Sequence, residues 1–152
     1  MSTKCKAGAA DHTARIALPC ARQSLAEAMA LVEAFCKQHK LDSRDRIALL
    51  LIVDELIANT LLHGRSSPMA YIDLSLEKQA DQVIVVYSDH GVPFDPLRDL
   101  PADQAERSLA ERLIGGIGWR LIHSYCRSVE YQRIDDANQL KLTRVLQVSR
   151  SD

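Results

Sequence analysis

The sequence lacks several features that would assign it to particular classes of protein. Its formal net charge is -1, so it has no basic excess of the kind that binds a nucleic-acid backbone. No apolar run approaches the roughly 20 residues needed to span a bilayer. Residues 1–14 contain no apolar core of a secretory signal. These absences predict a cytoplasmic protein that does not contact nucleic acid or membrane directly.

Cysteine usage excludes further kinds of site. The four cysteines, at positions 5, 20, 36 and 126, include no pair with CxxC spacing, so neither a zinc site nor a thioredoxin-like motif is expected. Without an export signal, they are expected to stay reduced. Hydrophobic residues make up 47% and charged residues 26% of the 152 residues, a balance that is ordinary for one globular domain. We expect residues 1–14 to be a disordered tail and residues 15–150 to form that domain.

The order of apolar patterns predicts an α+β fold. Strict alternation of Ile72, Leu74 and Leu76 indicates a strand with one buried face. Ser24, followed three residues later by Glu27, matches a capping box at the start of a helix. Strands are expected over 15–20, 71–77, 82–88, 128–133 and 139–148, and helices over 24–39, 43–63 and 116–126. Most of these strands form antiparallel hairpins, which favours helices packed on one face of a sheet.

The helix expected over residues 43–63 carries the first candidate site. Its stretch IALLLIV (47–53) is apolar all round, yet Glu55 and Asn59 follow it one helical turn apart on one face. Charged side chains are costly to bury unless something pairs with them. An amide oxygen can bind Mg²⁺ and a carboxylate can accept a proton, so the two residues could direct a nucleophile. The alternative is an exposed helix end with a surface glutamate.

Two glycine clusters form the other candidate sites. Asp89 and Gly91 lie in DHGVPFDP, directly after a predicted strand, where the carboxylate could accept a hydrogen bond from an amine and the glycine lets a ligand approach. Gly116 and Gly118 lie in GGIG at the start of a predicted helix, where backbone N–H groups can bind phosphate. The alternatives are a turn for the first cluster and a simple bend for the second.

A long irregular segment separates the two glycine clusters. Residues 89–114 hold three prolines, several charges and little periodicity beyond a short helix around 106–113. A loop of this length in a small domain is usually functional. Arg107 and Arg112 could reach a phosphate from this segment, or they could belong to a solvated, charged helix.

In their order and spacing, the three clusters resemble the GHKL ATPase domains shared by histidine kinases, gyrase B and MutL. DELIANTLLHG resembles the family's N box, DHGVPFDP its first glycine box, and ERLIGGIGWRLIHSYCRSVEYQR its second glycine box and the strand after it. The resemblance covers roughly residues 15–148 and is closest to the small anti-sigma-factor serine kinases of bacterial partner-switching systems. It implies a two-layer α/β sandwich with a mixed, mainly antiparallel sheet and helices on one face.

The resemblance also implies a role for each residue that matches a motif. Glu55 would be the general base, and Asn59 would be the ligand of Mg²⁺. Asp89 would accept a hydrogen bond from the adenine amino group of ATP, with Gly91 beside the base.

The second glycine box and the segment before it would surround the phosphates. Residues 97–114 would form an ATP lid, and Gly116 and Gly118 would lie at its end, near the phosphates. His63 resembles a family position near the nucleotide, although the helix dipole alone also favours a histidine at the end of a helix.

The function implied by the resemblance is phosphoryl transfer from Mg·ATP to a serine or threonine of a small antagonist protein. The same protein would sequester a sigma factor and would form a homodimer. One alternative is an ATP-binding regulatory module without kinase activity, and Glu55 argues against it. Another is a stand-alone ATPase or a histidine-kinase-like catalytic domain. A complete histidine kinase is not expected, because a phosphoacceptor helix pair does not fit before residue 15.

Overall fold

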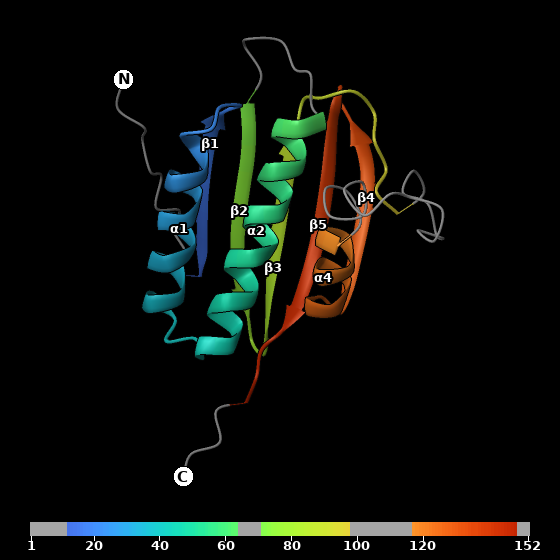
Figure 1. Cartoon of the computed structure of the whole chain (residues 1–152). Helices are drawn as coiled ribbons and strands as arrows, with labels where there is room; N and C mark the ends of the chain where they lie inside the picture. The colour runs from blue at the N-terminus through green and yellow to red at the C-terminus, as the bar shows by residue number, and fades with distance from the viewer. Residues whose placement is uncertain (1–11, 64–70, 98–116, 149–152) are drawn as a thin grey trace.

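A five-stranded sheet forms one layer of the structure, a computed structural model that describes residues 12–63, 71–97 and 117–148. Along the sheet the strands lie in the order β1-β2-β3-β5-β4, and each of these four pairings is antiparallel. β3 is therefore central, and β5 lies beside it although it comes last in the chain (Figure 1). The bounds are β1 Thr13–Pro19, β2 Tyr71–Gln79, β3 Gln82–Asp89, β4 Ser128–Ile134 and β5 Ala137–Val145.

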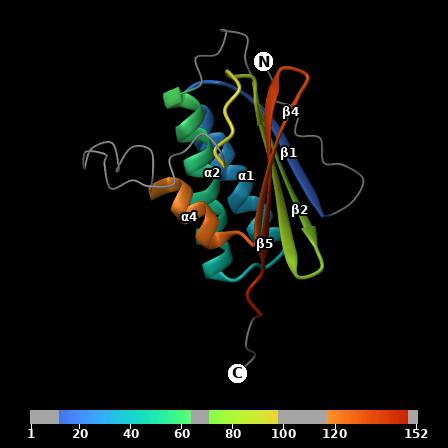
Figure 2. The ribbon, with the colours of Figure 1, turned by 90° about the vertical axis from the view of Figure 1, so that its right-hand side faces the viewer.

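The helices form the second layer. Those that the described residues form are α1 Ser24–Gln38, α2 Ser43–His63 and α4 Ile117–Tyr125, and all three cover the same face of the sheet (Figure 2). The expected α+β class and the one-sided helical layer are thus confirmed. Within the described ranges, no helix has the length and apolar character needed to cross a membrane.

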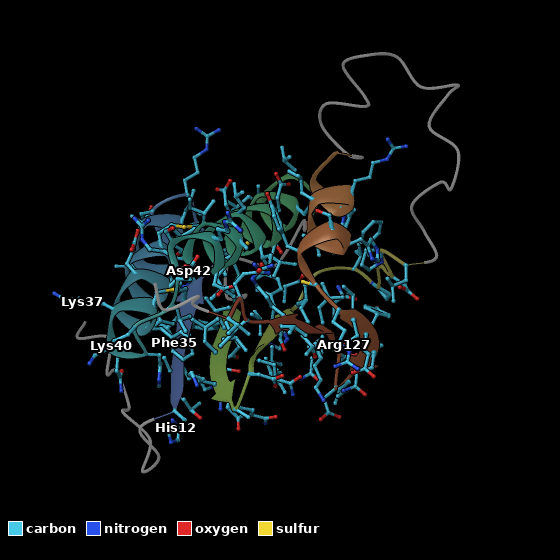
Figure 3. All side chains as sticks on the ribbon, turned by 90° about the horizontal axis from the view of Figure 1, so that it is seen from below. His12, Phe35, Lys37, Lys40, Asp42 and Arg127 are labelled. Atoms are coloured by element: carbon cyan, nitrogen blue, oxygen red, sulfur yellow. The ribbon has the colours of Figure 1, made fainter. Side chains whose placement is uncertain are left out.

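The core lies between the two layers and follows the period of each element. On β2, Ile72, Leu74 and Leu76 are fully buried, as their alternation predicted. Phe35 of α1 is buried above the sheet at the end of the molecule that faces the viewer in Figure 3. Its ring lies 4.5 Å, between centroids, from that of His39. Alternate positions of the strands and one face of each helix therefore supply the apolar contacts that hold the layers together.

The expected capping box at Ser24 is wrong. Ser24 is the first residue of α1 and is completely buried, and its hydroxyl donates a hydrogen bond to the carbonyl oxygen of Pro19 at 2.5 Å. Gln23 takes the cap position and makes no side-chain capping bond. The short connection after β1 brings the Pro19 carbonyl within reach, so the hydroxyl ties the helix to the strand instead of to its own N–H groups.

A buried ion pair joins α2, α4 and β5 at the end of the sheet far from Asp89. Arg144 of β5 and Asp45 of α2 are 7% and 1% exposed, and Nη2 of Arg144 lies 2.8 Å from Oδ1 of Asp45. Nη1 of the same guanidinium donates to the carbonyl oxygen of Tyr125, the last residue of α4, at 2.8 Å. The Gln147 N–H donates to the other carboxylate oxygen at 3.0 Å. This arrangement fixes the C-terminal end of α4 relative to the start of α2.

Some expectations fall outside the described residues. These are nearly all of the tail over 1–14, the lid over 97–114 except Leu97, the short helix around 106–113 with Arg107 and Arg112, and Gly116.

Candidate functional site

A cavity opens between α2, the end of β3 and the start of α4. Its volume is about 80 Å³, several times the roughly 10–15 Å³ that a single buried water needs. The loop 90–97, which follows β3, contributes Gly91, Val92, Phe94 and Pro96 to the lining. Apolar side chains make up much of the lining, namely Leu56, Val92, Phe94, Pro96, Trp119 and Leu140. The polar lining residues are Asn59, Thr60, Tyr87, Asp89, Tyr131 and Asn138. A cavity with an apolar lining and a few converging polar groups is typical of a site for a small organic molecule.

Asp89 is the one carboxylate that the described residues contribute to this lining. Its Oδ1 accepts hydrogen bonds from the Gly91 N–H at 2.9 Å and from Nδ2 of Asn138 at 3.0 Å. Its Oδ2 accepts from the Thr60 hydroxyl at 3.2 Å. Gly91 is buried. A partly buried carboxylate that is held in this way can accept a hydrogen bond from an amino group of a ligand.

Two hydroxyl groups, those of Thr60 and Tyr87, form a hydrogen-bonded pair next to the Asp89 carboxylate. The hydroxyl oxygens of Thr60 and Tyr87 lie 2.5 Å apart, and both residues are buried. Burial raises the pKa of Tyr87 well above its usual range, so its phenol stays protonated and can donate. The Thr60 proton is then available to the carboxylate or to the carbonyl oxygen of Leu56, which lies 3.1 Å away.

Asn59 lies on α2 and lines the cavity one helical turn after Glu55. Its amide nitrogen is buried and has no hydrogen-bond partner among the described residues. An unpaired buried amide costs free energy, on the order of 1–3 kcal/mol, unless something else satisfies it. The amide oxygen and nitrogen exchange places by rotation of the side chain. Asn59 is therefore the polar group in the cavity with the clearest capacity for a further ligand.

Glu55 lies beside the cavity and not in its lining. Its carboxylate is directly against Gly118 in the first turn of α4, so closely that a Cβ at position 118 would lie 2.6 Å from the Glu55 carboxyl carbon. Burial, together with the neighbouring charge of Asp54, raises the pKa of Glu55. A carboxylate with a raised pKa accepts a proton more readily at neutral pH than an ordinary glutamate does.

The structure brings most of the predicted site residues together. Asn59, Asp89 and Gly91 line one cavity, and Glu55 and Gly118 meet next to it, where Trp119 begins the α4 wall. Two predicted site residues, His63 and Gly116, are not among those placed at the cavity. His63 ends α2, but its side chain is outside what the structure describes, as is Gly116.

Sequence reasoning missed four of the polar lining residues, which are Thr60, Tyr87, Tyr131 and Asn138. Thr60 and Tyr87 could have been predicted from the sequence, because each lies one or two residues from a predicted site residue on the same element. Asn138 follows Asp89 by 49 residues, and only the register of β3 with β5 pairs the two. A prediction that the last strand pairs with β3 would have placed Asn138 beside Asp89.

Comparisons with known proteins agree with the fold. The chain is similar to the structure of the RsbU and RsbW domains of Rv1364c from Mycobacterium tuberculosis, with a TM-score of 0.65 and 14% identity, over 92% of this chain and 34% of that chain. It is also similar to the histidine kinase domain of a blue-light-activated histidine kinase from Erythrobacter litoralis, with a TM-score of 0.50 and 18% identity, over 92% of this chain and 66% of that chain. The chain thus spans about a third of the first structure and about two thirds of the second.

Residues 18–144 match the family described as the histidine kinase-like ATPase domain, and the chain belongs to that family. The chain is also similar to the serine/threonine-protein kinase BtrW of Bordetella bronchiseptica, with 31% identity over 118 aligned residues. The aligned residues cover 77% of this chain and 82% of BtrW. Membership in this family implies that the chain binds ATP.

Proposed function

We propose that this chain is a serine/threonine-protein kinase that transfers the γ-phosphoryl group of Mg·ATP to a small antagonist protein, and that it acts as an anti-sigma factor. The observation that carries the proposal is the position of Glu55. Its half-buried carboxylate, with a raised pKa, lies at the junction of α2 and α4, one helical turn from the cavity residue Asn59. A general base for a hydroxyl nucleophile needs this combination of exposure, proton affinity and closeness to the nucleotide.

In this proposal Asp89 binds the adenine ring. The exocyclic amine of adenine donates a hydrogen bond to the carboxylate, while Val92, Phe94 and Leu140 contact the faces and edge of the ring. The buried backbone of Gly91 leaves space beside the base because it carries no side chain. The ribose and phosphates extend from the base toward the start of α4.

The residues present fit a magnesium ion. In the described part of the chain, no three or more His, Cys, Asp or Glu side chains gather as a metal site. Mg²⁺ in nucleotide sites takes one or two protein oxygens and completes its octahedron with phosphate oxygens and water. Asn59 would supply the protein oxygen, Oδ1, after rotation of the amide has turned its unpaired Nδ2 away from the ion. The ion would neutralise charge on the transferred phosphoryl group.

Glu55 would take the proton of the attacking serine or threonine hydroxyl as the oxygen bonds to the γ-phosphorus and the bond to the β-phosphate oxygen breaks. Phosphoryl transfer needs mainly positioning and charge neutralisation, and a general base contributes roughly 10²–10⁴-fold. ADP and a phosphorylated antagonist are the products. The sigma factor as a second partner, and a homodimer as the assembly, follow from the resemblance to anti-sigma-factor kinases.

The proposal is tested by incubating the full chain with γ-labelled ATP and the small antagonist domain encoded nearest to its gene. We expect label on the antagonist in an acid-stable form, because phosphoserine and phosphothreonine survive acid and phosphohistidine does not. Replacing the labelled residue of the antagonist with alanine is the control. Acid-labile label would favour a histidine-kinase-like activity. ATP binding without any transfer would favour the regulatory module without kinase activity.

A further inference from the structure

Asn138 is buried at the end of the cavity, with 7% exposure, and uses its whole hydrogen-bonding capacity. Its Nδ2 donates to Oδ1 of Asp89 at 3.0 Å and to the carbonyl oxygen of Val92 at 2.8 Å. Its Oδ1 accepts from the Phe94 N–H at 3.1 Å and from the Tyr131 hydroxyl at 2.6 Å. An amide has two donors and two acceptor positions, so all four are filled.

The partners fix the orientation of this amide. Both groups that face Nδ2, in Asp89 and Val92, are acceptors, and both groups that face Oδ1 are donors. A flipped amide would place its oxygen against the acceptors of Asp89 and Val92 and an N–H against the Phe94 N–H, which would break three of the four bonds. The β3–β5 register, which sets Asn138 opposite Asp89, holds the amide in place from the backbone.

Asn138 in turn determines which oxygen of Asp89 a ligand meets. Oδ1 already accepts from both Gly91 and Asn138, which fills its two lone pairs. Among the described residues, Oδ2 accepts only from the Thr60 hydroxyl, at a long 3.2 Å, which leaves it an open position. A partial rotation of the carboxylate would weaken the hydrogen bonds from both Asn138 and the Gly91 N–H. The side chain therefore presents a single, fixed acceptor.

We propose that Asn138 is a positioning residue that makes the cavity select purine nucleotides with an amino group at position 6 over those with an oxo group. This inference rests on the proposed binding of ATP here. A fixed acceptor suits a 6-amino group, whereas a 6-oxo purine presents a carbonyl oxygen that repels it. A carboxylate released from Asn138 could turn toward the N1–H of a 6-oxo purine, so the discrimination between the two bases would shrink.

The test compares the affinities of ATP and ITP, which has an oxo group at position 6, by calorimetry on the full chain. Asn138→Leu keeps the approximate size and removes the hydrogen bonds. Asn138→Ser is the second variant, to be used if the leucine variant does not fold. Gln139→Leu is the matched control, because Gln139 lies next along β5 and bonds to Gln132 on an exposed part of the sheet. Circular dichroism and thermal melting verify the fold of each variant.

We expect the Asn138 variant to bind ATP about tenfold or more weakly, the scale of a hydrogen bond to a charged group, and ITP less than about threefold more weakly. The ratio of the two dissociation constants would then fall toward one, while Gln139→Leu keeps the parental ratio. Equal weakening of both nucleotides, or an unchanged ratio, would give Asn138 a structural role only and overturn the inference, as would failure of both variants to fold. A parent that binds no ATP, or that does not prefer ATP to ITP, would instead overturn the proposed nucleotide site.

Discussion

The carboxylate of Glu55 on α2 and the Cα of Gly118 on α4 are in direct contact, and a methyl group at position 118 would overlap the carboxylate. The Glu55 carboxylate can lie this close to α4 only because residue 118 has no side chain. None of the described glycines has a positive φ, so Gly118 is needed for space and not for backbone conformation. Because Gly118 has no side chain, the carboxylate of Glu55, the proposed base, can occupy this position.

Replacing Gly118 with alanine should separate catalysis from stability. The methyl group would displace the flexible end of Glu55, and a shift of about 1 Å in a catalytic group can lower the rate by about 10²-fold. The stability should stay equal or rise by up to about 1 kcal/mol, because alanine favours a helix more than glycine does. Single-turnover transfer and thermal melting measure the two effects. Ser124→Ala, later in the same helix, is the control, and a Gly118→Ala protein as active as the parent would contradict the contact.

The raised pKa of Glu55 predicts two pH effects with a definite sign. Transfer should fall as the pH drops through that raised pKa, at a higher pH than an ordinary glutamate would give, and Glu55→Gln should lose this step. In stability, the folded state holds the Glu55 proton more tightly than the unfolded chain does. The carboxyl group thus contributes stability below its unfolded pKa, and that contribution is lost as the pH rises through its folded pKa. Glu55→Gln should therefore melt higher than the parent at pH 7, with a smaller difference at pH 4. The opposite trend would argue against burial as the cause of the shift.

Removing the charge of Asp89 should weaken the binding of ATP. Asp89→Asn replaces the acceptor at the open Oδ2 position, and a hydrogen bond to a charged group contributes roughly 1.5–3 kcal/mol, or about tenfold or more in the dissociation constant. Asp73→Asn is the control, since Asp73 pairs with Arg15 on an exposed part of the sheet. Calorimetry that gives the same ATP affinity for parent and Asp89→Asn would remove Asp89 from the proposed site.

The buried pair of Arg144 and Asp45 should be far more important for stability than the exposed pair of Arg46 and Glu33. Arg144→Leu leaves the Asp45 carboxylate buried without its cation, which should cost about 3–5 kcal/mol of unfolding free energy. Arg46→Leu removes a well-formed but exposed pair, with side chains 44% exposed on each side, and should cost about 1 kcal/mol or less. Urea unfolding of the parent and of both variants measures the two losses of unfolding free energy. Equal losses would mean that the Arg144 pair does not anchor α4.

Local patterns in the sequence were enough to predict the elements. The predicted bounds of α2, Ser43 to His63, are those observed. The apolar content of this stretch indicated the helix, and the following Gly64 indicated where it ends. The prediction at Ser24 failed because a hydroxyl at a helix start has more than one acceptor in reach, and the sequence does not show that Pro19 lies nearby. Local rules describe neighbours along the chain, whereas this bond depends on the turn between β1 and α1.

The sequence motifs led to those residues of the candidate site that lie within or beside a motif, and to no others. Asn59, Asp89 and Gly91 line the cavity as their motifs suggested. Asn138 was missed, since it comes from a strand late in the chain and reaches Asp89 only through the sheet register. The contact of Glu55 with Gly118 was likewise not predictable, because it depends on how α4 packs on α2.

The measurement that tests the central proposal most directly is single-turnover phosphoryl transfer to the antagonist, alongside ATP affinity, for Glu55→Gln and Asn59→Ala. Glu55→Gln keeps the shape of the side chain and cannot take up a proton, so ATP should bind as in the parent while transfer falls by roughly 10²–10⁴-fold. Asn59→Ala removes the proposed magnesium ligand, so binding and transfer should weaken together. A Glu55→Gln protein that transfers phosphate as fast as the parent would contradict the assignment of Glu55 as the general base.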